Sequence, residues 1–154
     1  MIDHRIPETC AIIPVADSGE KKRIILRCDA AFLPRLSDRE GFEELFFKIN
    51  CYADFLAVYL EDAVGYVAMY ANDRENGTAF ITLLAVDPAY QNLHLGSRLL
   101  DAAIALAAHK GMRRIRLEVK LDNHRAIRLY ERKGFQKQAE TQNGTIYMIK
   151  PLSA

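Results

Sequence analysis

Residues 83–97 read LLAVDPAYQNLHLGS, a stretch that joins a strand to a helix and decides the fold. The apolar run up to Val86 predicts the end of a buried strand, which Asp87-Pro88 stops. Apolar residues at helical spacing follow from Leu99. Backbone N–H groups at the start of such a helix, together with its dipole, can bind an anion such as a diphosphate. The alternative is an ordinary connection whose N–H groups bind only water.

The rest of the chain alternates between strand and helix patterns. The predicted order is β, α, α, β, β, β, α, β, α, β, β. This order predicts a mixed α/β fold in which one mostly antiparallel sheet carries helices on both faces. The predicted elements are strands over residues 9–15, 55–60, 64–70, 78–86 and 113–120, helices over 21–32, after Ser37, after 95 and after Asn123, and a hairpin over 135–151 that turns at Asn143-Gly144.

Local signals place the helix ends. Asp17 stands three residues before Glu20, and Ser37 stands three residues before Glu40, which is capping-box spacing. Pro34 is expected to end the first helix. The last helix is expected to begin at a cap formed by Asp122 or Asn123 and to end at Gly134.

Length and charge narrow the class of protein. The 154 residues predict one domain over 1–154, and 21 Lys and Arg against 20 Asp and Glu give a net charge of +1. So neutral a chain is a poor candidate for binding nucleic acid through its phosphates. The basic run over 113–116 leaves a nucleic-acid-binding α/β domain as a third-ranked reading.

The cysteines and the N-terminus predict the compartment. Cys10, Cys28 and Cys51 are odd in number and far apart, so neither a disulfide framework nor a cysteine metal site is expected. His4, His109 and His124 also lack metal-ligand spacing, so no metal is expected. No signal peptide or membrane-spanning run is apparent, which predicts a cytoplasmic protein that does not bind membranes.

Two motifs carry a family resemblance. Val86-Asp87-Pro88 followed by Gln91-x-x-His94-x-Gly96 resembles motif A of the GNAT family of N-acetyltransferases. Residues 117–135, LEVKLDNHRAIRLYERKGF, are similar to its motif B, and the resemblance covers about residues 53–150. It implies the GNAT-like acyl-CoA N-acyltransferase fold and acetyl-CoA as co-substrate.

The resemblance also implies where the coenzyme binds. The backbone of Leu84, Ala85 and Val86 would pair with the pantetheine arm as an added strand does. Asn123 would lie near the thiol end. The pyrophosphate would be held by the loop amides of Asn92, Leu93, His94, Leu95, Gly96 and Ser97, with Arg98 either assisting or simply solvated.

His94 departs from the family pattern, because it replaces the first glycine of the loop. Glycine there lets the backbone take a positive φ and approach the phosphate closely. Histidine tolerates the left-handed region better than most residues. Its imidazole can also donate a hydrogen bond to a phosphate, and a merely tolerated side chain is the alternative.

Acyl transfer to an amine needs a neutral amine, a stabilised oxyanion and a proton for the departing thiolate. By the resemblance, Tyr130 would be the general acid, whereas helical spacing alone places it on a core face. Glu118 matches a glutamate that is the general base in some family members. An ion pair with Arg116 or Lys120 is its other reading, and Glu43, Glu44 and Asp54 stay open as bases.

The leading hypothesis is an acetyl-CoA-dependent N-acetyltransferase that uses direct transfer to a primary amine in a ternary complex. The alternative is a non-catalytic acyl-CoA-binding or regulatory module on the same fold. The acceptor is expected to be a small-molecule or peptide amine, and the protein a monomer or homodimer. Nothing in the sequence indicates which amine is used.

Overall fold

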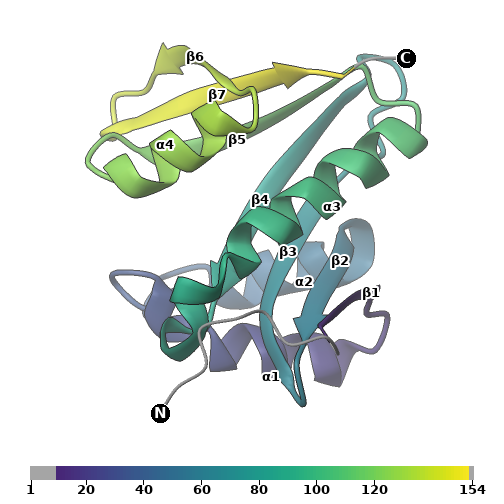
Figure 1. Ribbon diagram of the computed structural model, residues 1–154, viewed down its shortest axis with the longest axis vertical. Coiled ribbons are helices and arrows are strands. Elements are labelled where there is room, and N and C mark those ends of the chain that lie inside the picture. Colours follow the sequence, from purple (N-terminus) through teal and green to yellow (C-terminus); the bar gives the residue numbers. More distant parts are fainter. Residues whose placement is uncertain (1–9, 153–154) are drawn as a thin grey trace. The chain divides into compact units, whose positions relative to one another are not determined.

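The computed structural model describes residues 10–152 (Figure 1). Seven strands are hydrogen-bonded in the order β1-β2-β3-β4-β5-β7-β6. β4 and β5 are parallel, whereas the β1–β2, β2–β3, β5–β7 and β6–β7 ladders are antiparallel. The elements are β1 (Ala11–Pro14), α1 (Ser18–Arg27), η1 (Asp29–Ala31), η2 (Leu36–Asp38), α2 (Phe42–Tyr52), β2 (Asp54–Tyr59), β3 (Ala63–Tyr70), β4 (Thr78–Val86), η3 (Pro88–Leu93), α3 (Leu95–His109), β5 (Arg114–Lys120), α4 (His124–Arg132), β6 (Gln136–Glu140) and β7 (Thr145–Pro151).

This architecture confirms the predicted order of elements and the mostly antiparallel mixed sheet. The chain divides into two compact units, Met1–Met69 with Leu83–Ala103, and Tyr70–Thr82 with Ile104–Ala154. β4 and α3 each begin in one unit and end in the other. The single domain over 1–154 stays a prediction. No helix within residues 10–152 is long and apolar enough to cross a bilayer.

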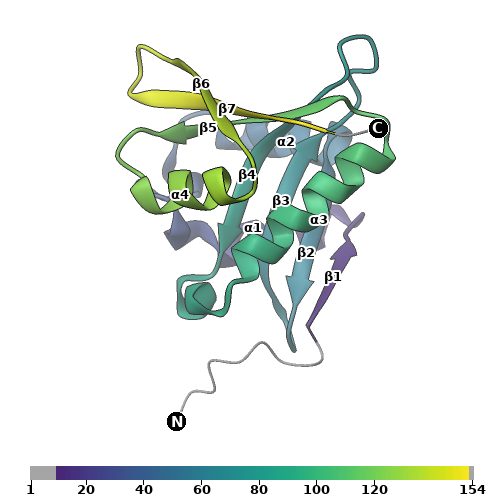
Figure 2. The ribbon, with the colours of Figure 1, turned by 45° about the horizontal axis from the view of Figure 1, so that its top comes forward.

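The first unit is built around β2 and β3, whose side chains alternate between two faces. Tyr66 is fully buried and stacks on Phe55, with ring centroids 5.1 Å apart. Helices α1 and α2 lie on one face of these strands, and α3 begins on the other (Figure 2). A Cβ on Gly65 would lie 3.2 Å from Leu99 Cδ1 of α3, so the glycine allows this helix to approach closely.

The second unit is a small sheet with α4 alongside β5 and β7 (Figure 1). The predicted alternation of β5 is confirmed, since Ile115, Leu117 and Val119 are buried while Glu118 and Lys120 are exposed. The buried side chains mark the face that is covered, so Glu118 points to the opposite face.

The C-terminal hairpin turns where the sequence predicted. β6 and β7 flank the Asn143-Gly144 pair, and Gly144 has a φ of +78°. Gly134, just after α4, also has a positive φ, in keeping with its predicted role at the end of that helix.

The structure corrects two predicted boundaries and confirms one cap. The Glu20 N–H donates to Asp17 Oδ2 over 2.8 Å, as the first capping box predicts. Helix α1 ends at Arg27 rather than residue 32, and a 3₁₀ turn follows. The second capping box was wrong: α2 begins after Gly41, and Ser37 bonds Asp29 instead, through its N–H (2.9 Å) and its hydroxyl (2.5 Å).

The physical reason for these corrections is tertiary. Asp29 is nearly buried, so its carboxylate needs donors, and Ser37 supplies them across the loop between α1 and α2. The first predicted strand is shorter than expected, running over Ala11–Pro14. Its expected start at Thr9, like His4, lies outside the described residues.

Candidate active site

The second half of β4 offers a backbone edge to a ligand. The β4–β5 ladder pairs Thr78–Ile81 with Arg114–Leu117, while β4 itself continues to Val86. Asp87 N–H donates to Val64 O of β3 over 2.7 Å. Because backbone groups alternate along a strand, Ala85 also faces β3, while Leu84 and Val86 face the edge that β5 covers only in its first half. Of the three predicted backbone contacts, Leu84 and Val86 are therefore the better placed.

The loop after β4 is held by bonds within itself. Asp87 caps η3, because its Oδ1 accepts a hydrogen bond from Ala89 N (3.0 Å). The Gln91 side-chain amide donates to Val86 O over 3.3 Å and ties the loop back to the strand. Leu93 is buried. These contacts give the loop a defined path to His94.

His94 occupies the left-handed region, with φ 58° and ψ 24°. It is the one non-glycine residue with positive φ among residues 10–152. This is the left-handed conformation to which glycine is suited, so His94 adopts the positive φ that a glycine would allow at this position. The His94 side chain is exposed.

Helix α3 begins directly after this residue. The His94 carbonyl accepts from Arg98 N over 3.3 Å, which starts the helical pattern at Leu95. The first N–H groups of a helix have no acceptor within it, and the dipole gives this end a partial positive charge. The N–H groups of Leu95, Gly96 and Ser97 therefore suit an anion.

Gly96 has no structural requirement to be glycine. Its φ is not positive, and a Cβ at this position would meet only Val86 Cγ2, at an ordinary 3.9 Å. A glycine within a helix costs about 1 kcal/mol relative to alanine. A residue that the packing does not need, at the start of α3, is consistent with the close approach of a ligand.

Glu118 belongs to a chain of hydrogen bonds in the second unit. Thr145 Oγ1 donates to Glu118 Oε2 over 2.5 Å. Thr145 has one hydroxyl proton, so Thr141 Oγ1, 2.6 Å away, must donate to Thr145. Asn143 N–H donates in turn to Thr141 Oγ1 over 3.2 Å. The hairpin thus directs a row of donors at one carboxylate.

Arg116, which with Lys120 was the alternative ion-pair partner for Glu118, bonds Gln138 and packs on Tyr147. Its Nε donates to Gln138 Oε1 over 2.9 Å, and its guanidinium carbon lies 3.8 Å from the centre of the Tyr147 ring. Tyr147 is directly across from Glu118 in the β5–β7 ladder. Arg116 and Glu118 thus share a face of the sheet but bond to different groups.

Tyr130 is held in α4 with its ring against another ring. The Tyr130 and Phe135 ring centroids lie 5.9 Å apart at an interplanar angle of 60°. Burial raises the pKa of Tyr130 to about 12. Packing against Phe135 and a role as proton donor are thus compatible, because a phenol that keeps its proton at neutral pH remains a donor.

Of the two predicted caps, Asp122 and Asn123, the structure shows Asn123, whose Oδ1 accepts from Ala126 N over 3.2 Å. Among the other carboxylates, Glu43 Oε1 lies 3.5 Å from Lys22 Nζ. Glu44 is exposed in the first turn of α2, and Asp54 begins β2. Sequence reasoning missed Thr141 and Thr145, because their bonds depend on how the hairpin pairs with β5.

Comparisons with known proteins give one consistent family. The model of the acetyltransferase (GNAT) family matches residues 23–135. A spermine/spermidine N(1)-acetyltransferase of Bacillus subtilis is 38% identical over 102 residues, covering 61% of this chain and 66% of the relative. A putative ribosomal protein bS18-alanine N-acetyltransferase of the same organism is 38% identical over 76 residues, covering 46% of this chain and 50% of the relative.

The chain therefore aligns with slightly less than two-thirds of the first relative's length and with half of the second's. Among solved structures, PaiA N-acetyltransferase from Thermoplasma acidophilum, in complex with coenzyme A, has a TM-score of 0.73. It is 17% identical, and the match covers 93% of this chain and 99% of that one, which shows a shared fold.

Proposed function

The chain belongs to the acetyltransferase (GNAT) family, and from this premise we propose that it is an acetyl-CoA-dependent N-acetyltransferase acting on a primary amine. The observation that carries the proposal is the backbone at His94 and Gly96. A left-handed residue leads into a helix whose first turn includes a glycine that packing does not require. This arrangement suits the diphosphate of a coenzyme.

The residues present fit acetyl-CoA in its two polar requirements. The N–H groups from Asn92 to Ser97 would hold the pyrophosphate, with those at the start of α3 contributing most. The edge of β4 at Leu84 and Val86 would pair with the amides of the pantetheine arm. Asn123 would contact the coenzyme near its thiol end. When bound, the coenzyme supplies an acetyl group activated as a thioester.

The reaction is proposed as one direct transfer. The amine nitrogen forms a bond to the acetyl carbon, and the carbon–sulfur bond breaks. Glu118 would accept the proton that the amine loses, directly or through water, and Tyr130 would donate a proton to the departing sulfur. The balance is one acetamide and one free thiol, with no covalent intermediate on the protein.

The two residues proposed to transfer protons belong to consecutive elements of the second unit. Tyr130 belongs to α4, and Glu118 lies on the face of β5 opposite its buried side chains. A nucleophile attacks a thioester carbon from one face, and the thiolate then departs. The proposal therefore requires that both side chains reach one reacting centre, directly or through water.

Calorimetry and a thiol-release assay test the proposal together. We expect the protein to bind acetyl-CoA at micromolar to low millimolar concentration, and to release free thiol in the presence of an accepted amine. The first amines to test are spermidine and an alanine-containing peptide, because the names of the two Bacillus subtilis relatives refer to spermine or spermidine and to an alanine of a ribosomal protein. No binding at millimolar acetyl-CoA would contradict the proposal. Binding without turnover across a broad amine panel would favour a non-catalytic module.

A further inference from the structure

Asp87, where β4 passes into the candidate coenzyme loop, is held from three directions. Its N–H donates to Val64 O of β3 over 2.7 Å, and its Oδ1 accepts from Ala89 N over 3.0 Å. Its Oδ2 accepts from Arg27 Nε, the last residue of α1, over 3.1 Å. A helix from 60 residues earlier in the chain thus holds the point where the loop begins.

Arg27 makes two further contacts, one with Asp62 between β2 and β3 and one with Tyr90 in the loop. Besides Asp87, its Nη1 lies 3.4 Å from Asp62 Oδ2, and its guanidinium carbon lies 5.9 Å from the centre of the Tyr90 ring in η3. The Arg27 and Asp87 side chains are only 28% and 19% exposed, so water screens this pair less than a surface ion pair.

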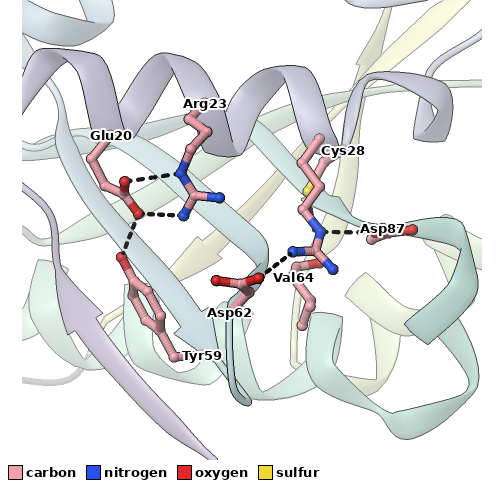
Figure 3. A network of polar contacts seen from close by, with 8 residues as sticks. Glu20, Arg23, Cys28, Tyr59, Asp62, Val64 and Asp87 are labelled. Carbon is pink, nitrogen blue, oxygen red and sulfur yellow. Dashed lines mark hydrogen bonds and ion pairs between the residues drawn. The ribbon is translucent and has the colours of Figure 1, made fainter.

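The residue after α1 and the first residue of the loop donate hydrogen bonds to one carbonyl of β3. Cys28 Sγ donates to Val64 O over 3.6 Å, and this oxygen also accepts the Asp87 N–H. Figure 3 shows Cys28, Val64 and Asp87 gathered beside the end of the helix. α1, β3 and the start of the loop therefore meet at one point.

Arg23, one turn earlier on α1, provides the contrast. Its Nε and Nη2 bond Glu20 over 3.0 and 2.7 Å, and Glu20 also accepts from Tyr59 Oη over 3.2 Å. These contacts join α1 to β2 and do not include the loop after β4. Both arginines lie on α1 and pair with carboxylates, but Arg27 bonds Asp87 at the start of the loop whereas Arg23 bonds Glu20 of its own helix.

We propose that Arg27 is a positioning residue for the coenzyme. It contacts no coenzyme atom itself, but holds Asp87 so that η3 and the left-handed His94 present the first turn of α3 in its binding conformation. The inference rests on the proposed function. A loop that spends less time in that conformation binds more weakly in proportion, because affinity scales with the competent fraction.

Variants at both ends of the pair test the proposal, with acetyl-CoA titrated by calorimetry. We expect Arg27→Gln to weaken binding by about 5- to 10-fold, in the lower range of coupling between sites. Asp87→Asn should weaken it similarly, because asparagine keeps an acceptor for Ala89 N–H but loses its charge. The double variant should bind no worse than the weaker single variant, because both changes break one interaction. Arg27→Lys should lie between, since a lysine lacks the planar fork that reaches both carboxylates.

Arg23→Gln is the matched control and should bind as the wild type does. Steady-state kinetics distinguish a positioning role from a general loss of folded protein. Arg27→Gln should raise the KM for acetyl-CoA and leave kcat at saturating coenzyme unchanged. If the wild type fails to bind acetyl-CoA, both the proposed function and this inference are wrong. The inference alone is wrong if the wild type binds acetyl-CoA and both Arg27→Gln and Asp87→Asn bind it as tightly as the wild type does. It is also wrong if Arg23→Gln weakens binding as much as Arg27→Gln does.

Discussion

Thr145 Oγ1 lies 2.5 Å from Glu118 Oε2, and its only hydroxyl proton points at that carboxylate. Thr141 donates to the same Thr145 oxygen, so the hairpin holds the Thr145 hydroxyl in the orientation that bonds Glu118. The contact fixes one carboxylate oxygen and leaves the other to face solvent or substrate. A proton acceptor held in one orientation is what general base catalysis requires.

Replacing Glu118 should reduce turnover strongly. Glu118→Gln keeps the shape but cannot accept a proton, so we expect kcat to fall by about 10²- to 10⁴-fold. Thr145→Val, which leaves the carboxylate without its orienting donor, should lower kcat by about tenfold, while Thr145→Ser should retain activity. Steady-state thiol release measures all three. Glu140→Gln, on the exposed strand β6, is the control. Unchanged turnover in Glu118→Gln would assign the base to another carboxylate or to water.

Tyr130→Phe should separate catalysis from binding. The phenylalanine ring can keep the packing against Phe135, but it cannot protonate the departing thiolate. We expect kcat to fall by about 10²-fold or more, with acetyl-CoA affinity within about twofold of the wild type. Calorimetry and single-turnover thiol release give the two quantities. Parallel loss of affinity and turnover would mean that Tyr130 acts through packing.

Burial of Tyr130 predicts how stability changes at high pH. The pKa rises from 10 in the unfolded chain to about 12 in the folded protein. Above pH 10 the unfolded state loses a proton that the folded state keeps, so the stabilisation that Tyr130 provides is lost as pH rises toward 12. The free energy of unfolding of the wild type minus that of Tyr130→Phe isolates the contribution of this residue. We expect this difference to fall by about 1 kcal/mol between pH 9 and 11. Urea unfolding at the two pH values measures it. A constant difference would show that the phenol ionises normally.

The backbone at His94 should matter more than its imidazole. Because His94 has a φ of 58°, His94→Gly should keep stability within about 0.5 kcal/mol and acetyl-CoA affinity within about threefold. His94→Val should destabilise by about 1–2 kcal/mol and weaken binding, since a β-branched residue fits this region poorly. Thermal unfolding and calorimetry provide the comparison. A loss of affinity above tenfold in His94→Gly would assign a phosphate contact to the imidazole.

Alanine substitutions at Gly96 and Gly65 should have opposite effects on the stability of the fold. Gly96→Ala should stabilise the fold slightly, by about 0.5–1 kcal/mol, and weaken acetyl-CoA binding by about tenfold or more, because the added methyl occupies space the coenzyme needs. Gly65→Ala should destabilise the fold, because its Cβ would lie 3.0 Å from Ala85 O and 3.1 Å from Val58 Cγ1. Unchanged affinity in Gly96→Ala would place the phosphate elsewhere.

Much of the fold was predictable because its signals are local. The alternation in β5, the Asp17 cap and the turn at Asn143-Gly144 each depend on a few neighbouring residues. The prediction of the second capping box failed because Ser37 instead bonds Asp29, eight residues earlier in the chain, and a rule based on three-residue spacing does not consider that partner. The candidate site residues were predicted from their match to family motifs. A motif match identifies such residues but does not identify the side chains that orient them, such as Thr145 and Arg27.

The sequence by itself determined the order of strands and helices, the loop between β4 and α3, and the residues Glu118, Asn123 and Tyr130 as candidates. The order and the loop follow from periodicity and capping, which act over short stretches of chain, and the three candidates follow from the resemblance to the family motifs. Only the tertiary structure decided that Thr145 orients Glu118 across 27 residues of sequence and that Arg27 holds Asp87 across 60. Such contacts depend on strand register and on the packing of helix against sheet, and a one-residue shift in either would remove them.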